Sequence, residues 1–173
     1  MASGFVNNAS TDRDPVDTIL AQWAKERPDL DVSPMGLIGR TTRIAHYFRK
    51  AIGKTFSEFD LQPGEFDVLA TLRRSGKPYQ LSPTELFKSM MVSSGTMTNR
   101  IDRLETAGLV ERVPDERDRR GTLIHLSDKG FSLIEAAVTA HVANEHCILN
   151  GLDDVEKKAL SDLLRKLLLS LEE

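Results

Sequence analysis

The stretch from Ser82 to Gly130 constrains the fold of this chain more than any other part of its sequence. Its beginning carries a helix start signal, in which Ser82 suits the N-cap, Pro83 suits the first helical position, and Glu85 completes a capping box. We expect this helix to end near Met90, because a turn of about three residues is typical of the joint in a helix-turn-helix. The stretch therefore opens with a short, capped helix.

A second helix and a two-stranded ribbon should follow. Ser93 can cap the second helix, and Gly108 can end it in the left-handed conformation. Two β-rich runs, 109–113 and 121–126, flank a charged loop, and a short strand at 79–81 can pair with this hairpin. This order is that of a winged helix-turn-helix domain. The sequence thus predicts a mainly α fold with a small β wing, and it favours DNA binding.

The second helix should have one apolar and one small polar face. Met97, Ile101 and Leu104 recur at helical spacing, which predicts a buried stripe. Small polar side chains elsewhere on the helix can approach base edges closely and exchange hydrogen bonds with them. The candidate base-reading residues are Ser93, Ser94, Thr96, Thr98 and Asn99. Arg103 faces mostly outward and can reach a phosphate, whereas Arg100 borders the stripe, so we expect it to have an internal partner.

The loop of the predicted wing carries arginines next to acidic residues. Arg117, Arg119 and Arg120 can enter a minor groove or contact phosphates. From Ser93 to His125, however, six arginines are balanced by six acidic residues. This neutral sum leaves open a second interpretation, in which the winged helix binds another protein. Retention on heparin and a steep salt dependence of DNA binding would distinguish the two.

Composition narrows the class of protein further. With 173 residues, 40% hydrophobic residues and a net charge of −3, the chain fits one globular domain that must gather positive charge on one face to bind DNA. No stretch approaches the ~20 apolar residues of a membrane span, and the single cysteine, Cys147, fits a reducing compartment. We therefore expect a cytoplasmic protein without a membrane segment. Redox sensing by Cys147 and pH sensing by His141 stay open.

No motif indicates catalysis or a bound cofactor. The sequence has neither a glycine-rich phosphate loop nor a nucleophile elbow. His141 and Glu145 lie one helical turn apart, but two such side chains alone do not make a metal site. We therefore expect no catalytic residue, no metal and no cofactor.

The chain should consist of a disordered tail, residues 1–13, and one domain, residues 14–173. The domain divides into N-terminal helices (14–59), the winged helix (60–126) and C-terminal helices (127–173). Outside the winged stretch, helices are expected at 15–26, 33–59, 65–74, 127–149 and from Asp153 onward. The leucine stripe of the last helix is too wide for an isolated tail, so it needs a partner in a second chain or in its own.

Two motifs resemble the multiple antibiotic resistance regulator (MarR) family of winged-helix repressors. They are Asp118-x-Arg120 in the wing and Leu126-Ser127-x-x-Gly130 after it. The family usually has threonine in place of Ser127, and serine keeps the hydroxyl group for capping. The segments QWAKERPDLDVSPM and EFDVLATLRRSG resemble the urate-responsive subgroup, the PecS and HucR type, and the likeness covers nearly the whole chain from Pro15.

This resemblance implies a repressor that binds a double-stranded operator as a homodimer. The N- and C-terminal helices of the two chains would interlock and serve as dimerisation helices. Two recognition helices would then lie about one DNA turn apart, roughly 34 Å, and read a pseudo-palindrome.

The subgroup also implies four residues that respond to a small aromatic anion such as urate. The matching residues are Trp23 on the extra N-terminal helix, Asp67 before the winged domain, Arg100 in the recognition helix and Arg112 in the first wing strand. A planar anion can stack on an indole and accept paired hydrogen bonds from a guanidinium. Its charge is repelled by Asp67 unless a cation compensates, and movement of Arg100 would shift the recognition helix.

Each of these four residues has a structural alternative. Trp23 can be a core residue, Asp67 and Arg100 can form a structural salt bridge, and Arg112 can contact a phosphate. A pocket suited to urate can also admit a related compound. A repressor that responds to a phenolic or antibiotic ligand therefore remains the alternative within the regulator class.

Overall fold

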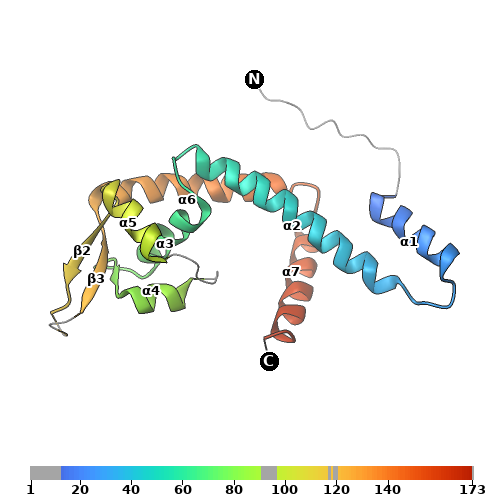
Figure 1. The fold of residues 1–173 in the computed structure, drawn as a ribbon. Helices are drawn as coiled ribbons and strands as arrows, with labels where there is room; N and C mark the ends of the chain where they lie inside the picture. Colours follow the sequence, from blue (N-terminus) through green and yellow to red (C-terminus); the bar gives the residue numbers. More distant parts are fainter. Residues whose placement is uncertain (1–12, 91–96, 117, 119–120, 173) are drawn as a thin grey trace, which may run out of the picture. The chain divides into compact units, whose positions relative to one another are not determined.

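The computed structural model describes residues 13–90, 97–116, 118 and 121–172. Internal contacts divide the chain into two compact units, residues 1–49 and 50–173. The described residues form helices and a small antiparallel sheet (Figure 1), which confirms the mainly α fold with a β wing. The elements are α1 (Pro15–Glu26), α2 (Ser33–Ser57), α3 (Pro63–Arg74), β1 (Gln80–Leu81), α4 (Pro83–Ser89), α5 (Met97–Thr106), β2 (Val110–Pro114), β3 (Thr122–Leu126), α6 (Asp128–Ile148) and α7 (Asp154–Leu169).

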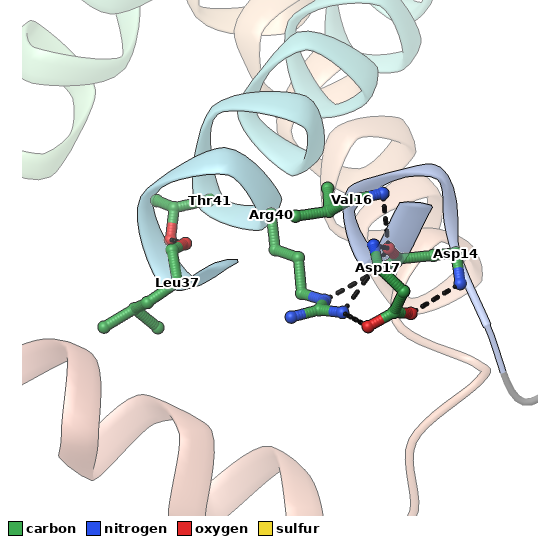
Figure 2. Close-up of polar contacts among 6 residues, drawn as sticks. All are labelled: Asp14, Val16, Asp17, Leu37, Arg40 and Thr41. Atoms are coloured by element: carbon green, nitrogen blue, oxygen red, sulfur yellow. Dashed lines mark hydrogen bonds and ion pairs between the residues drawn. The ribbon is translucent and has the colours of Figure 1, made fainter. Parts of the chain in front are cut away.

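In the first unit, a charged contact joins α1 to α2. Asp14 caps α1 by accepting hydrogen bonds from the backbone N–H groups of Val16 and Asp17. Arg40 of α2 reaches both acids, with its Nε 2.7 Å from Asp14 Oδ2 and its Nη2 2.6 Å from Asp17 Oδ1 (Figure 2). The hydrogen bond from Arg40 lowers the pKa of Asp14 below its ordinary value. We call this contact among Arg40, Asp14 and Asp17 the Arg40 clasp.

Two glycines of α2 let α1 approach closely. A Cβ atom at Gly39 would lie 3.4 Å from Val16 Cγ1, and one at Gly36 would lie 3.1 Å from Leu20 Cδ1. Val16 is thereby buried, with 4% of its surface exposed. The missing side chains at these two glycines thus allow close helix packing.

The core of the second unit is built around α3. Val68, Leu69 and Leu72 are fully buried, and α3 contacts α4, α5, α6 and β3. This helix begins at Pro63, so the predicted start at residue 65 was wrong. The reason is a capping box, in which the backbone N–H of Gln62 donates to Glu65 Oε2 at 2.8 Å. Pro63 and Gly64 therefore belong to the first turn of the helix.

Two further boundaries differ slightly from the prediction. Helix α2 ends at Ser57 and not at residue 59, because the next residues form tight turns and Asp60 adopts a φ of 56°. Strand β2 is shifted by one residue and includes Pro114. These differences, like that at the start of α3, are of one or two residues at the ends of elements.

The sheet has the order β1-β3-β2, and all its pairs are antiparallel. Val110 pairs with Leu126 and Pro114 with Thr122, so β2 and β3 form the predicted hairpin of the wing. The short strand β1 pairs with β3, as expected for residues 79–81. The sheet therefore joins the helix-turn-helix segment to the wing.

Ser127 and the adjacent glycines fix the joint between α5, the wing and α6. Gly108 ends α5 with a φ of 69°. The hydroxyl of Ser127 donates to the Gly108 carbonyl at 2.8 Å and accepts from the N–H of Gly130 at 3.0 Å. A Cβ at Gly130 would lie 2.0 Å from the carbonyl oxygen of Leu109, so no larger residue fits there without a backbone shift. This geometry explains the Leu-Ser-x-x-Gly motif.

None of the described helices combines the length and the apolar character needed to cross a membrane.

Candidate nucleic-acid interface and effector residues

Helix α5 has the two faces that its sequence predicts. Ile101 and Leu104 are each 2% exposed, and Met97 packs against the same core. Thr98 and Asn99 are exposed on the outside of the helix. A small polar surface is therefore available to a DNA groove. Three other candidate base-reading residues, Ser93, Ser94 and Thr96, lie outside the described residues.

The three wing arginines, Arg117, Arg119 and Arg120, also lie outside the described residues. The strands that carry the wing loop pair with each other as far as Pro114 and Thr122. Beyond this pair, the N–H of Asp115 donates to the carbonyl of Gly121 at 3.1 Å. The structure thus defines the base of the wing, and contact of the arginines with DNA stays a prediction.

Arg103 is exposed, as predicted, and it also has a partner in α3. Its Nε lies 2.9 Å from Glu65 Oε1. The side chain of Arg103 is 59% exposed, whereas that of Glu65 is only 6% exposed. A buried carboxylate therefore supports an arginine on the outer face of α5.

Arg112 joins the first wing strand to α5. Its Nη2 lies 2.5 Å from Asp102 Oδ1, and its Nη1 pairs with Glu105. The hydrogen bond to Asp102 raises the pKa of Arg112 above its ordinary value. Asp102 and Glu105 are three residues apart, so both lie on the side of α5 that faces the strand. Arg112 thus holds the first wing strand, β2, and α5 together.

Arg100 lies against the first turn of α3, on the inner side of α5. A Cβ atom at Gly64 would stand 2.4 Å from Cζ and Nε of Arg100, so the guanidinium occupies space that only glycine leaves free. Arg100 also interacts electrostatically with Asp67, which lies about one helical turn after Gly64. Burial raises the pKa of the Asp67 carboxyl, and the charge of Arg100 offsets part of this effect. The expected internal partner of Arg100 is therefore α3.

An open pocket of about 490 Å³ lies between α3 and α5. It joins the exposed side chains of Asn99 and Arg103 to Arg100. The lining residues are Gln62, Glu65, Asn99, Arg100, Asp102 and Arg103. Of the four predicted effector residues, Arg100 alone lines this pocket, and Arg112 is linked to it through Asp102. Trp23 is 41% exposed on α1, in the first unit.

His141 lies on α6, beside two aromatic rings. Its ring centroid is 5.1 Å from those of Phe56 and Phe66, and its Nε2 is 3.2 Å from Glu145 Oε1. Within the described part of the chain, its buried Nδ1 has no hydrogen-bond partner. Among the described residues, no group of three or more histidine, cysteine, aspartate or glutamate side chains is placed to hold a metal ion.

Sequence reasoning missed the two α3 residues that contact the arginines of α5. Glu65 was recognisable as the third residue of a capping box with Gln62. Gly64 was recognisable as a glycine within the first turn of a helix, where it costs stability relative to alanine and therefore suggests a close contact. Which arginine contacts each of these two residues, however, depends on how α3 packs against α5.

Comparison with known proteins places these features in context. Residues 61–122 match the model of the MarR family. The HTH-type transcriptional regulator PecS of Dickeya dadantii (strain 3937) is 47% identical over 149 residues, which cover 86% of this chain and 90% of that protein.

Two solved structures are also similar. That of a MarR mutant from Escherichia coli complexed with operator DNA is 26% identical, with a TM-score of 0.66, over 84% of this chain and 97% of that chain. The second structure, of Bordetella bronchiseptica BpsR, concerns regulation of DNA binding by 6-hydroxynicotinic acid. It is 26% identical, with a TM-score of 0.66, over 75% of this chain and 90% of that chain. PecS is a transcriptional regulator, and the two solved structures are of DNA-binding proteins, which confirms the expectation that the chain is no enzyme.

Proposed function

Because this chain belongs to the MarR family of transcription regulators, we propose that it is a repressor released from its operator by a small aromatic anion such as urate. The observation that carries this proposal is the position of Arg100. Its helix presents Asn99 outward, while its guanidinium lies against Gly64 and close to Asp67. One side chain thus connects the DNA-facing helix to a candidate effector site.

We infer that the active form is a homodimer. Helix α7 has no buried residue within the described chain, although one side of it is rich in leucine. Its exposed apolar residues are Val155, Leu160, Leu163, Leu164, Leu167, Leu168 and Leu169. An apolar surface of this kind is unfavourable in water and is typical of a protein interface. A two-fold dimer would present two copies of α5 to the two halves of a pseudo-palindrome.

The charges around Asp67 support a functional role for this part of the protein. The pKa of Asp67 is raised by burial even though Arg100, Arg74 and His141 all act in the opposite direction. Such incompletely compensated carboxylates are common at functional sites. A planar anion would bind the guanidinium of Arg100 and be repelled by Asp67. In the related BpsR, 6-hydroxynicotinic acid, another small ring acid, regulates DNA binding.

Release of DNA would follow from movement of Arg100. An anion that draws the guanidinium away from Gly64 removes a contact between α3 and α5, and it changes the orientation of Asn99 and Arg103. Arg112 and its partners Asp102 and Glu105 would carry the shift to the wing. The effector acts in this way only if it binds the DNA-free state more tightly than the DNA-bound state.

A titration of urate into the protein–operator complex tests this proposal. We expect wild-type protein to release labelled operator at micromolar to millimolar urate, and Arg100→Ala to keep binding the operator without responding to urate. Arg165→Ala is a matched control, because Arg165 is exposed on α7 and pairs with Asp162 of the same helix. No release of wild-type protein at millimolar urate, or an unchanged response of Arg100→Ala, would contradict the effector assignment.

Two alternatives have distinct outcomes. Release by a phenolic or antibiotic compound but not by urate would identify the other ligand class within the same mechanism. Failure to bind any duplex, together with no retention on heparin, would favour a protein-binding winged helix. We further propose that residues 14–173 act as one regulator domain with the N-terminal, winged-helix and C-terminal parts predicted from the sequence.

A further inference from the structure

We propose that Glu65 is a positioning residue for DNA binding, which orients Arg103 so that its guanidinium binds a backbone phosphate. The inference rests on the proposed function, because it requires DNA on the outer face of α5. It differs from the effector mechanism, since it concerns the affinity of the ligand-free protein for the operator. The contact that carries it is the 2.9 Å ion pair between Arg103 Nε and Glu65 Oε1.

Glu65 is held rigidly. Only 4% of the residue is exposed, so its carboxylate has little water to solvate it. Burial of a charged carboxylate is unfavourable unless it is paired and hydrogen-bonded. Both of its oxygens have partners, because Oε2 accepts from the N–H of Gln62 at 2.8 Å while Oε1 contacts Arg103. The first turn of α3 therefore fixes the position of this negative charge.

Arg103 is bound on one edge and free to bind on the other. A guanidinium is planar and carries five N–H groups in fixed directions, so a contact at Nε leaves the edge formed by the two terminal amino groups pointing elsewhere. Within the described part of the chain, Glu65 is the one ion-pair partner of Arg103. Asn99 lies one helical turn earlier on the same face and is exposed. The free edge thus belongs to the surface that would meet DNA.

Capping of α3 alone does not explain why residue 65 is a charged glutamate. Glutamine completes a capping box as well as glutamate does. A negative charge next to a DNA-binding surface repels phosphates, so it should weaken binding if it has no other effect. If Glu65 aligns Arg103 with a phosphate, the loss of that alignment outweighs the repulsion. Removal of the charge should therefore raise the affinity for DNA if Glu65 only caps α3, and lower it if Glu65 also aligns Arg103.

Glu65→Gln separates them, because it keeps the size and capping capacity of the side chain and removes its charge. We expect the affinity for operator DNA to fall about tenfold, and the slope of log K against log salt to decrease by about one, as for the loss of a single phosphate contact. Arg103→Gln should behave in the same way, and the double variant should lose little more than either single variant. The measurements are fluorescence anisotropy titrations with operator and with an unrelated duplex over a salt series.

Two further variants make the result specific. Glu111→Gln removes an exposed acid of β2 and should bind operator as tightly as wild type or more tightly. Arg103→Lys keeps the positive charge but has a single ammonium group that cannot bind Glu65 and a phosphate through separate edges, so it should resemble Glu65→Gln. Because Arg103 is exposed, this variant tests the inference even if Glu65→Gln folds poorly.

Three outcomes would overturn the inference. The first is that Glu65→Gln binds operator as tightly as wild type with an unchanged salt slope, and the second is that Arg103→Lys is indistinguishable from wild type. In either case the proposed function stands and the positioning role is refuted. If wild-type protein binds no operator at all, the proposed function itself is refuted.

Discussion

Gly64→Ala offers a direct test of the role of Arg100, because the added methyl group and the guanidinium cannot occupy the same space. The new Cβ would stand 2.4 Å from Cζ and Nε of Arg100 and 2.8 Å from its Nη2. Carbon atoms in contact are about 3.5–4.0 Å apart, so the guanidinium must move by roughly 1 Å or more. It can do so at low cost, since it is the end of a flexible side chain.

The fold itself should tolerate this change. Gly64 lies in the first turn of α3 and does not have a positive φ, and alanine is favoured over glycine in helices by up to about 1 kcal/mol. The perturbation therefore falls on Arg100. Loss of one charge-assisted hydrogen bond between effector and guanidinium is worth about 1.5–3 kcal/mol. This corresponds to a roughly ten- to hundredfold higher urate concentration for half-maximal release of DNA.

The assay is release of a fluorescently labelled operator by urate, followed by anisotropy, with thermal unfolding measured on the same samples. Gly53→Ala is the matched control, because it is also a helical glycine and a Cβ there would meet no atom within 4 Å. We expect both variants to unfold at or slightly above the wild-type temperature and only Gly64→Ala to respond weakly to urate. Release at the same urate concentration in all three proteins would refute the assigned role of Arg100.

Three other perturbations have defined outcomes. Gly130→Ala should destabilise the protein by about 3 kcal/mol, because its Cβ would stand 2.0 Å from the Leu109 carbonyl oxygen, and an unchanged unfolding midpoint would contradict this. Asp67→Asn should raise the unfolding temperature at pH 7, since burial raises the pKa of Asp67 and the ionised form is disfavoured. The gain should shrink as the pH falls through that raised pKa and the wild-type carboxyl becomes protonated, so a gain that is constant with pH would exclude this cause. Leu167→Asp on α7 should convert a dimer into monomers in sedimentation experiments, whereas a dimer that persists at micromolar concentration would place the interface elsewhere.

Local patterns predicted much of the fold, because the relevant contacts are close in sequence. The stripe of Met97, Ile101 and Leu104 is buried as its helical spacing indicates. The hydroxyl of Ser127 caps α6, and Gly108 ends α5 in the left-handed region. In each of these cases, the residue type and its nearest neighbours are sufficient to determine the local conformation.

The contacts of the arginines were harder to predict, because they depend on how distant elements pack. Arg100 was expected to have an internal partner from its direction on the helix, but Gly64 could not be identified without the packing of α3 against α5. Arg103 was predicted to face outward, and its second contact with Glu65 arises from the same packing. Arg112 was expected near an effector, and its pairing with two acids of α5 depends on the path of β2.

The pairing of Arg112 with Asp102 and Glu105 has a consequence for operator choice. Strand β2 follows α5 after a short turn, and Arg112 of the strand forms ion pairs with these two acids of the helix. The helix and the base of the hairpin should therefore move as one rigid body. If α5 reads bases and the hairpin contacts the DNA backbone, as the proposed function requires, this joint sets the offset between the two contacts. Changes of surface side chains alone would then not let the protein bind an operator with a different offset. Relatives whose operators have another spacing should differ at the positions equivalent to these three residues.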